Sequence, residues 1–222
     1  MPSVFLSAGH GGSDPGAVAN GLVEKTVNLN VLLACREVLV RHKVTVYTSR
    51  TTDAEDPVGE EVREANASRA DIAVSFHANA GGGDGSEAYH WVGDANGQRL
   101  AQLCEKHVKQ IGQNSRGCKS GNHLYFINST NMTSVLLESF FLDNAKDKTI
   151  GDTLAEQRAF GEAYAKAILE YFGIAYKPAT QTKPAATTEK IYCVQVGAFT
   201  KKANAEKLMR ELKAKGYPAF VK

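Results

Sequence analysis

The sequence lacks the features that mark membrane-spanning, secreted and nucleic-acid-binding proteins. No apolar run reaches the roughly 20 residues that a helix needs to cross a bilayer, so we expect no membrane-spanning segment. No basic leader with an apolar core and a cleavage site precedes the first apolar run, so we expect no signal peptide. Lys and Arg number 26 against 24 Asp and Glu, and a formal charge of +2 argues against a basic nucleic-acid-binding surface. We therefore predict no membrane and no nucleic acid as partners.

Cysteines are few as well, four in 222 residues, and none forms a CxxC pair. Cys35 and Cys104 fall on helical patterns and Cys193 on a strand pattern, whereas Cys118 lies in a Gly/Ser-rich turn. We expect free and mostly buried thiols, with a disulfide between Cys104 and Cys118 as the open alternative. The absence of an HExxH helix, a GxSxG turn and a P-loop excludes three common classes of hydrolase site.

The chain alternates short apolar runs with amphipathic stretches, a pattern typical of an α/β sheet with helices on both faces. The expected strands are residues 3–9, 44–48, 71–80, 86–92, 123–127 and 134–138. The expected helices are residues 22–41, a short helix opened by residues 53–56, residues 95–111 and residues 153–172. Residues 112–122, polar and punctuated by glycine, are expected to form an exposed loop. We therefore predict a twisted, mostly parallel sheet of about six strands.

The composition changes near the end of the chain. Residues 177–189 contain two prolines, several threonines and no large apolar residue, which is typical of a semi-extended linker. Beyond them, the pattern predicts a strand over 191–199, an amphipathic helix over 202–215 and a strand over 217–221, a β-α-β piece too small to bury a core unaided. We expect a main domain over residues 1–174, a linker over 175–190 and a small C-terminal piece over 191–222.

Polar side chains that can bind metal or move protons follow several of these apolar runs. His10 ends the first expected strand, His77 lies near the end of the strand at 71–80, and Glu138 follows three apolar residues. Glu24 lies in the first turn of the helix that follows a glycine-rich loop, so its carboxylate can face the same edge. Ligands bind at the carboxyl ends of the strands in open α/β sheets. We therefore expect these four side chains to lie together.

Catalytic zinc sites use three His, Glu or Asp ligands and leave one position for water. His10, Glu24 and His77 supply such a set, and Glu138 is placed to take the proton of that water. Each ligand also has an ordinary alternative. His10 could cap a turn, His77 could be structural, and Glu24 could be a first-turn acid favoured by the helix dipole. Taken jointly, the four residues favour a site with one zinc ion.

Four motifs in order resemble the zinc-dependent N-acetylmuramoyl-L-alanine amidases of the amidase-3 type. They are GHGGSDPGA at 9–17, GLVEK at 21–25, SFHANA at 75–80 and LLESFFLDN at 136–144, and the resemblance covers about residues 3–172. It implies zinc on His10, Glu24 and His77, with Glu138 as catalytic acid/base, and makes Asn79 a candidate for substrate binding. The implied reaction is hydrolysis of the amide between the lactyl group of muramic acid and the L-alanine of the stem peptide in peptidoglycan.

The C-terminal piece resembles half of a SPOR-type sporulation repeat, on the segments YCVQVGAF at 192–199 and ANAE at 203–206. Such modules bind the glycan strands of peptidoglycan, although only one β-α-β half is present here. Seven basic residues against two acidic ones between 201 and 222 also suggest a weak attraction to anionic wall polymers, with a solvated helix face as the alternative.

These observations together predict a monomeric hydrolase that acts at the bacterial cell wall. It would be an endolysin of a phage or prophage or an autolysin of a spore-forming bacterium, released by lysis or deprived of an original leader. Two alternatives stay open: a wall-binding protein of the same fold that has lost its activity, and a zinc peptidase that cuts within the stem peptide.

Overall fold

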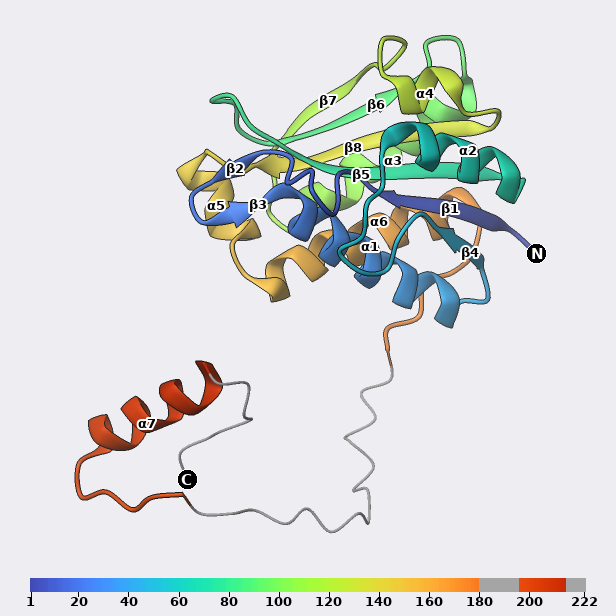
Figure 1. The fold of residues 1–222 in the computed structure, drawn as a ribbon. Helices are drawn as coiled ribbons and strands as arrows, with labels where there is room; N and C mark the ends of the chain where they lie inside the picture. The colour runs from blue at the N-terminus through green and yellow to red at the C-terminus, as the bar shows by residue number, and fades with distance from the viewer. Residues whose placement is uncertain (180–195, 215–222) are drawn as a thin grey trace. The chain divides into compact units, whose positions relative to one another are not determined.

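The computed structural model describes residues 1–179 and 196–214. The chain divides into two compact units, residues 1–177 and residues 178–222, and each is described by itself. Within the described residues, none of the helices has both the length and the apolar character that crossing a bilayer requires. The larger unit contains the sheet and six of the helices shown in Figure 1.

A six-stranded sheet forms the centre of the larger unit, in the order β4-β1-β5-β8-β6-β7. Its strands are β1 (Ser3–Ala8), β4 (Thr45–Thr48), β5 (Ile72–Asn79), β6 (Ser86–His90), β7 (Ser115–Ser120) and β8 (Thr133–Phe141). Neighbouring strands run parallel except β6 and β8, which are antiparallel. A separate short hairpin joins β2 (Val18–Ala19) to β3 (Leu22–Val23). The predicted sheet of about six mostly parallel strands is confirmed.

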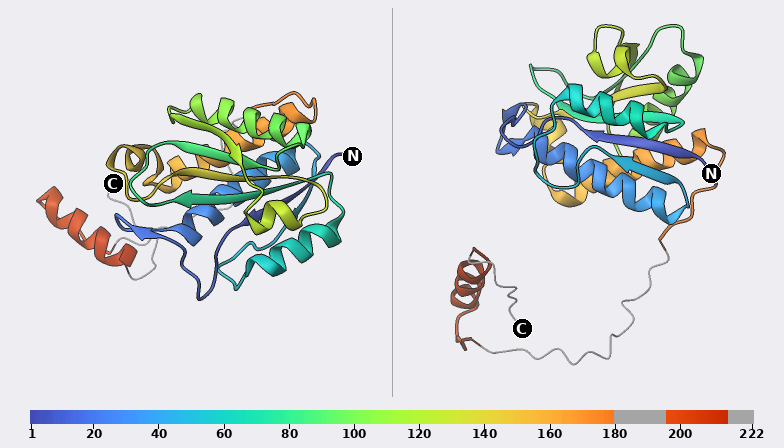
Figure 2. Two further views of the ribbon diagram at one scale, coloured as in Figure 1. Left: turned by 90° about the horizontal axis from the view of Figure 1, so that it is seen from above. Right: turned by 45° about the vertical axis from the view of Figure 1, so that its right-hand side comes forward.

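Helices cover both faces of this sheet, as Figures 1 and 2 show. The first face packs on α1 (Glu24–Arg41), α3 (Ala95–Lys109) and α6 (Leu154–Tyr171). The second face packs on α2 (Val58–Ser68) and α4 (Tyr125–Ser129). Successive side chains of a strand point to opposite faces of the sheet. Val74 and Phe76 therefore pack in the first layer and Ala73 in the second. A short helix, α5 (Ala145–Gly151), connects β8 to α6.

The strand register brings three polar residues onto one face. His77 on β5 lies opposite Glu138 on β8, and Glu138 lies opposite Glu87 on β6. Directly opposed residues on neighbouring strands share a face, and Ala73 on β5 and Leu136 on β8 show that this face is the one that packs on α2 and α4. The three residues lie beyond those packed positions, towards the carboxyl end of β5 and β8. Ligands bind at this end of the strands in open α/β sheets.

Two predicted elements are wrong. Residues 112–122 contain strand β7 rather than an exposed loop, and residues 123–127 begin the single-turn helix α4 rather than form a strand. The sequence of β7, SRGCKS, has little strand propensity, so its pairing depends on side chains elsewhere: the carboxylates of Glu87 and Glu105 accept hydrogen bonds from Arg116 and Ser115. In α4, Phe126 and Ile127 are buried in one helical turn, and so short an apolar run does not distinguish helix from strand.

Several boundaries also differ from the prediction. Helix α1 begins at Glu24 because Leu22 and Val23 pair with β2, and α2 begins after Pro57 rather than at residues 53–56. Helix α5 was not predicted. In the smaller unit, α7 (Lys202–Ala214) agrees with the predicted helix, while residues 196–199 contain no strand. The predictions for residues 180–195 and 215–222, including most of the linker and the strand at 217–221, lie outside the described residues.

The cysteine prediction can be compared at three positions. Cys35 and Cys104 are buried free thiols, and Cys118 is a partly buried free thiol on β7. The alternative disulfide between Cys104 and Cys118 is therefore not formed. Cys193 lies outside the described residues.

Helix α6 approaches α1 closely at Gly161. A Cβ atom there would lie 2.3 Å from the carbonyl oxygen of Val31 and 2.7 Å from the Cβ of Ala34. We predict that Gly161→Ala lowers the free energy of unfolding by about 1–3 kcal/mol through overpacking, although alanine is the better helix former. Urea denaturation measures the change.

Gly59 on α2 provides the matched control, because no atom lies within 4 Å of a Cβ built there. We expect Gly59→Ala to raise the free energy of unfolding by up to about 1 kcal/mol. If both substitutions stabilised the protein equally, the close approach of α1 and α6 would be wrong.

Candidate metal centre

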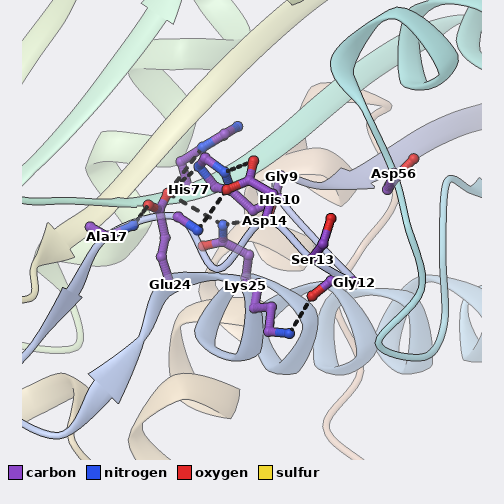
Figure 3. A network of polar contacts seen from close by, with 12 residues as sticks. Gly9, His10, Gly12, Ser13, Asp14, Ala17, Glu24, Lys25, Asp56 and His77 are labelled. Carbon is purple, nitrogen blue, oxygen red and sulfur yellow. Dashed lines mark hydrogen bonds and ion pairs between the residues drawn. The ribbon is translucent and has the colours of Figure 1, made fainter.

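Three of the predicted residues meet at the carboxyl end of β1 and β5. One donor atom each from His10, Glu24 and His77 lies within 4.8 Å of the others. The Oε1 atom of Glu24 lies 3.3 Å from Nε2 of His10 and 3.2 Å from Nδ1 of His77. Figure 3 shows the three side chains converging from the loop after β1, from the first turn of α1 and from β5. The structure thus brings three of the four predicted residues together.

The backbone around His10 is shaped for this convergence. His10 has φ 66°, a left-handed conformation that costs a non-glycine residue about 1–3 kcal/mol and that turns the chain out of β1. A Cβ atom on Gly9 would lie 2.1 Å from Cε1 of His77, so only glycine lets this ring pack over the turn. Gly16, at φ 64°, closes the loop where a Cβ atom would lie 2.6 Å from Oε2 of Glu24.

Other polar groups hold these side chains in place. Asp14 contacts Nδ1 of His10 through Oδ2 at 2.8 Å, which leaves Nε2 facing Glu24. The N–H of Ala17 donates to Oε2 of Glu24 at 2.8 Å, and Asn28 donates to the carbonyl of Gly9 at 2.9 Å. A carboxylate on the far nitrogen of a ligating histidine is a frequent feature of metal sites, where it orients the ring. The sequence analysis missed these supporting roles, although Asp14 and Asn28 follow His10 and Glu24 at a spacing of four.

Arg50 is a buried residue that links the separate parts of the site. Its side chain donates to the carbonyls of Ala8 at 2.9 Å, Thr52 at 3.1 Å and Lys25 at 2.8 Å. It therefore ties the end of β1 to the first turn of α1 and to the segment after β4. Asp56 lies 3.9 Å away as its buried counter-ion. No local pattern signals this role, because all the hydrogen bonds that Arg50 donates go to backbone carbonyls.

The charges of the cluster reinforce one another. The hydrogen bond with Glu24 raises the pKa of His10 to about 9, and Asp14 adds to this effect. Burial alone would raise the pKa of Glu24, but hydrogen bonds with His10 and His77 outweigh it and hold that pKa well below its usual range. The pKa of His77 is raised as well: burial lowers it, but the hydrogen bond with Glu24 and the negative charges of Glu138, Glu24 and Glu61 together outweigh that effect. Positive charge is therefore favoured around an ionised Glu24.

Glu138 lies beside this cluster on β8, opposite His77. Its Oε2 atom is buried and has no hydrogen-bond partner among the residues that the structure describes. The pKa of Glu138 is raised to about 7, mainly by burial. The negative charges of Glu24 and Glu87 contribute to this rise, whereas His77 opposes it. An unpaired buried carboxylate oxygen is costly in a folded protein, and Oε2 is left to accept a hydrogen bond from water or from a bound group.

Asn79 lies two residues beyond His77, at the end of β5. Its Oδ1 accepts the N–H of Ala80 at 2.8 Å, and its own carbonyl accepts the N–H of Leu142 at 2.8 Å. The residue thus stands at the same end of the sheet as the cluster, and its contribution to substrate binding stays a prediction.

Comparison with known proteins agrees with this geometry. Residues 4–170 match the family described as N-acetylmuramoyl-L-alanine amidase. This chain belongs to that family. The amidase is 35% identical to the N-acetylmuramoyl-L-alanine amidase CwlM of Bacillus licheniformis over 225 residues, which cover all of this chain and 85% of the relative. It is 31% identical to a sporulation-specific N-acetylmuramoyl-L-alanine amidase of Bacillus subtilis, over all of this chain and 84% of that protein.

The fold of the amidase is similar to solved structures as well. The catalytic domain of CwlV, an N-acetylmuramoyl-L-alanine amidase of Bacillus (Paenibacillus) polymyxa var. colistinus, superimposes with a TM-score of 0.73 and 31% identity, over 79% of this chain and all of that one. Residues 188–222 match the SPOR domain. The predicted resemblance to both families is confirmed, and the protein is a cell-wall hydrolase that cleaves between N-acetylmuramic acid and L-alanine.

The role of Arg50 leads to a prediction for Arg50→Met. This change keeps the bulk of the side chain but removes all three hydrogen bonds and leaves Asp56 without its cation. We expect the free energy of unfolding to fall by about 3 kcal/mol and the affinity for Zn²⁺ to fall about tenfold or more, because the turn at His10 and the start of α1 lose their common tether. Chemical denaturation and competitive zinc titration measure the two effects.

Arg63→Met is the control, since Arg63 is exposed on α2 and its partners, Glu60 and Glu64, are exposed neighbours on the same helix. Its effect on stability should stay within about 0.5 kcal/mol. An Arg50→Met variant with unchanged zinc affinity would show that Arg50 does not position the ligands.

Proposed function

We propose that the amidase carries out this hydrolysis with one zinc ion bound by His10, Glu24 and His77 and with Glu138 as general base and acid. The observation that supports it most directly is the convergence of three donor atoms within 4.8 Å beside a buried carboxylate oxygen without a partner. The strand register gives this arrangement its rigidity, because His77 and Glu138 lie opposite each other on β5 and β8.

The donor set fits zinc. Two imidazole nitrogens and one carboxylate oxygen form a set typical of catalytic zinc sites, which keep a position free for water. Glu24 is ionised and Nδ1 of His10 is engaged by Asp14, so Nε2 of His10 is free to ligate. Zinc in such a site lowers the pKa of a bound water towards about 7 and polarises the carbonyl to be attacked.

Glu138 supplies the proton transfers that amide hydrolysis needs. In its ionised form Oε2 accepts a proton from the attacking water, and in its protonated form it gives that proton to the nitrogen of the leaving L-alanine. A pKa of about 7 suits both tasks, because the carboxyl group gains and loses a proton readily at neutral pH. The buried position of Oε2 also keeps bulk water from competing for this proton.

The products of wall digestion separate this function from its alternatives. Purified peptidoglycan treated with the amidase should release peptides whose new amino terminus is L-alanine and leave the glycan strands intact. A free D-amino acid would indicate a peptidase acting within the stem peptide, new reducing ends would indicate a glycosidase, and binding without any product would indicate an inactive wall-binding protein.

The smaller unit supports a role in holding the enzyme at its substrate. We infer from the match to the SPOR domain that residues 188–222 contribute to binding the wall. Helix α7 contains Lys202, Lys207, Arg210 and Lys213 against two glutamates, which favours anionic wall polymers at low salt. A monomeric enzyme, acting either in the release of a phage or in the life cycle of a spore former, stays part of this proposal.

Glu138→Gln tests the proton transfers. The amide keeps the shape of the side chain but cannot take up the proton, so we expect kcat to fall about 100-fold or more with zinc content unchanged. The wild-type rate should also fall as the pH drops through the pKa of Glu138, because only the ionised form accepts a proton. Near-normal turnover by the variant would show that another group is the base.

His10→Ala tests the metal ligands. Loss of one of three ligands should weaken zinc binding by more than about 100-fold and lower activity in parallel, as measured by metal analysis after dialysis. His123→Ala, which removes an exposed histidine in contact with Tyr89, should retain the metal of the wild type. Full zinc occupancy in His10→Ala would contradict the assigned ligand set.

A further inference from the structure

The face of the sheet that bears His77 and Glu138 continues past them to the edge strand. Glu87 on β6 lies opposite Glu138, and its Oε1 accepts hydrogen bonds from Arg116 and Lys119, both on β7. The hydroxyl of Tyr89 donates to the other oxygen of Glu87 at 2.6 Å. The register therefore places a catalytic carboxylate, a second carboxylate and two cations on three successive strands.

The two cations leave a net positive charge open to solvent. The side chain of Glu87 is 3% exposed, whereas those of Arg116 and Lys119 are 40% and 35% exposed. Glu87 neutralises only one of the two cations, and Asp84, the other acid that acts on Arg116, is paired with Lys146, so about one positive charge remains beside Glu138 when Glu138 is protonated. Arg116 uses its Nε for Glu87, and its two terminal nitrogens donate no hydrogen bond to any described residue. They are available to a ligand.

Both cations are also held in position. The guanidinium of Arg116 lies 5.3 Å from the centroid of the Phe141 ring, and Nζ of Lys119 lies 5.9 Å from that of Tyr89. The contacts of Glu87 with these cations help to join β7 to β6, and a carboxylate as buried as Glu87 needs such partners to be tolerated. The arrangement also fixes a positive charge from β7 over β6, the strand next to the one that bears the catalytic acid/base.

The substrate has a matching negative charge on one side only. The lactyl carboxyl of muramic acid is consumed in the scissile amide, and the N-acetylated sugars of the glycan are neutral. Free carboxylates near the scissile bond therefore belong to the stem peptide. Glu87 is on β6, next to β8 with Glu138, and neighbouring strands lie about 4.8 Å apart. An extended peptide advances about 3.3 Å per residue. A carboxylate on the residue after L-alanine would therefore reach the cations that contact Glu87.

We propose that Arg116 and Lys119, held by Glu87, form a subsite for the free carboxylate of the second residue of the stem peptide. The inference rests on the proposed function, since it takes Glu138 to mark the scissile amide. A planar guanidinium with free terminal nitrogens is suited to bind a carboxylate through two parallel hydrogen bonds. The subsite would orient the peptide across the sheet edge and select stem peptides that have not been amidated at this position.

A pair of substrates tests the subsite on the wild-type enzyme. Soluble glycan chains are prepared with stem peptides whose second residue is either D-glutamate, with a free α-carboxylate, or its α-amide, D-isoglutamine. We expect kcat/KM to be about tenfold higher for the acid, mainly through KM, and this preference to shrink in high salt. Equal kcat/KM values for the two substrates would overturn the subsite.

A double variant locates the preference. Arg116→Gln with Lys119→Gln retains hydrogen-bond donors for Glu87 but removes both charges, and it should lower kcat/KM about tenfold for the acid while leaving the amide nearly unchanged. The control is Lys106→Gln with Arg158→Gln, which removes two exposed cations that pair with exposed acids on other helices. This control should keep the preference for the acid. Equal losses in both double variants would reduce the effect to net charge and overturn the subsite.

The outcomes distinguish this inference from the proposed function. Cleavage of both substrates at the bond to L-alanine, with equal efficiency, would refute only the subsite. If neither substrate were cut at that bond, the proposed function would fail first, and the subsite would fall with it.

Discussion

The contact of one carboxylate with two imidazoles is the interaction on which the chemistry that we propose for this fold depends. Glu24 begins α1, yet its side chain lies within 3.3 Å of ring nitrogens from the loop after β1 and from β5. A buried carboxylate needs such partners to be tolerated at all. Gly9, beneath the ring of His77, and the left-handed conformation of His10 make this approach possible. The geometry of the site therefore depends on the conformation of this loop.

Much of this could be predicted because several local patterns, each with alternatives of its own, pointed jointly to the same arrangement. An apolar run that stops at a polar residue is a strand reaching the edge of the sheet, and parallel strands bring such ends together. His10, His77 and Glu138 each followed a run of this kind, and Glu24 followed from its place in the first turn of a helix. The alternation of strands and helices along the sequence likewise predicted a sheet with helices on both faces.

What could not be predicted depends on tertiary contacts. Strand β7 has a sequence suited to a loop and is paired because Glu87 and Glu105, on β6 and α3, engage its side chains. Arg50 donates hydrogen bonds to backbone carbonyls of three segments. Every residue has a backbone carbonyl, so the sequence pattern does not indicate which ones Arg50 binds. The number of strands was right although one member was wrong, since residues 123–127 form a helical turn and β7 takes that place in the sheet.

The reversed direction of β6 has a consequence of its own. Because β6 and its partner β7 run against β8, the beginnings of these two strands stand at the end of the sheet where β5 and β8 finish. Four adjacent strands thus place ionisable groups side by side on regular, hydrogen-bonded backbone. The recognition and the chemistry that we propose therefore rest largely on regular backbone, and His10 alone among the proposed metal ligands is placed by a loop.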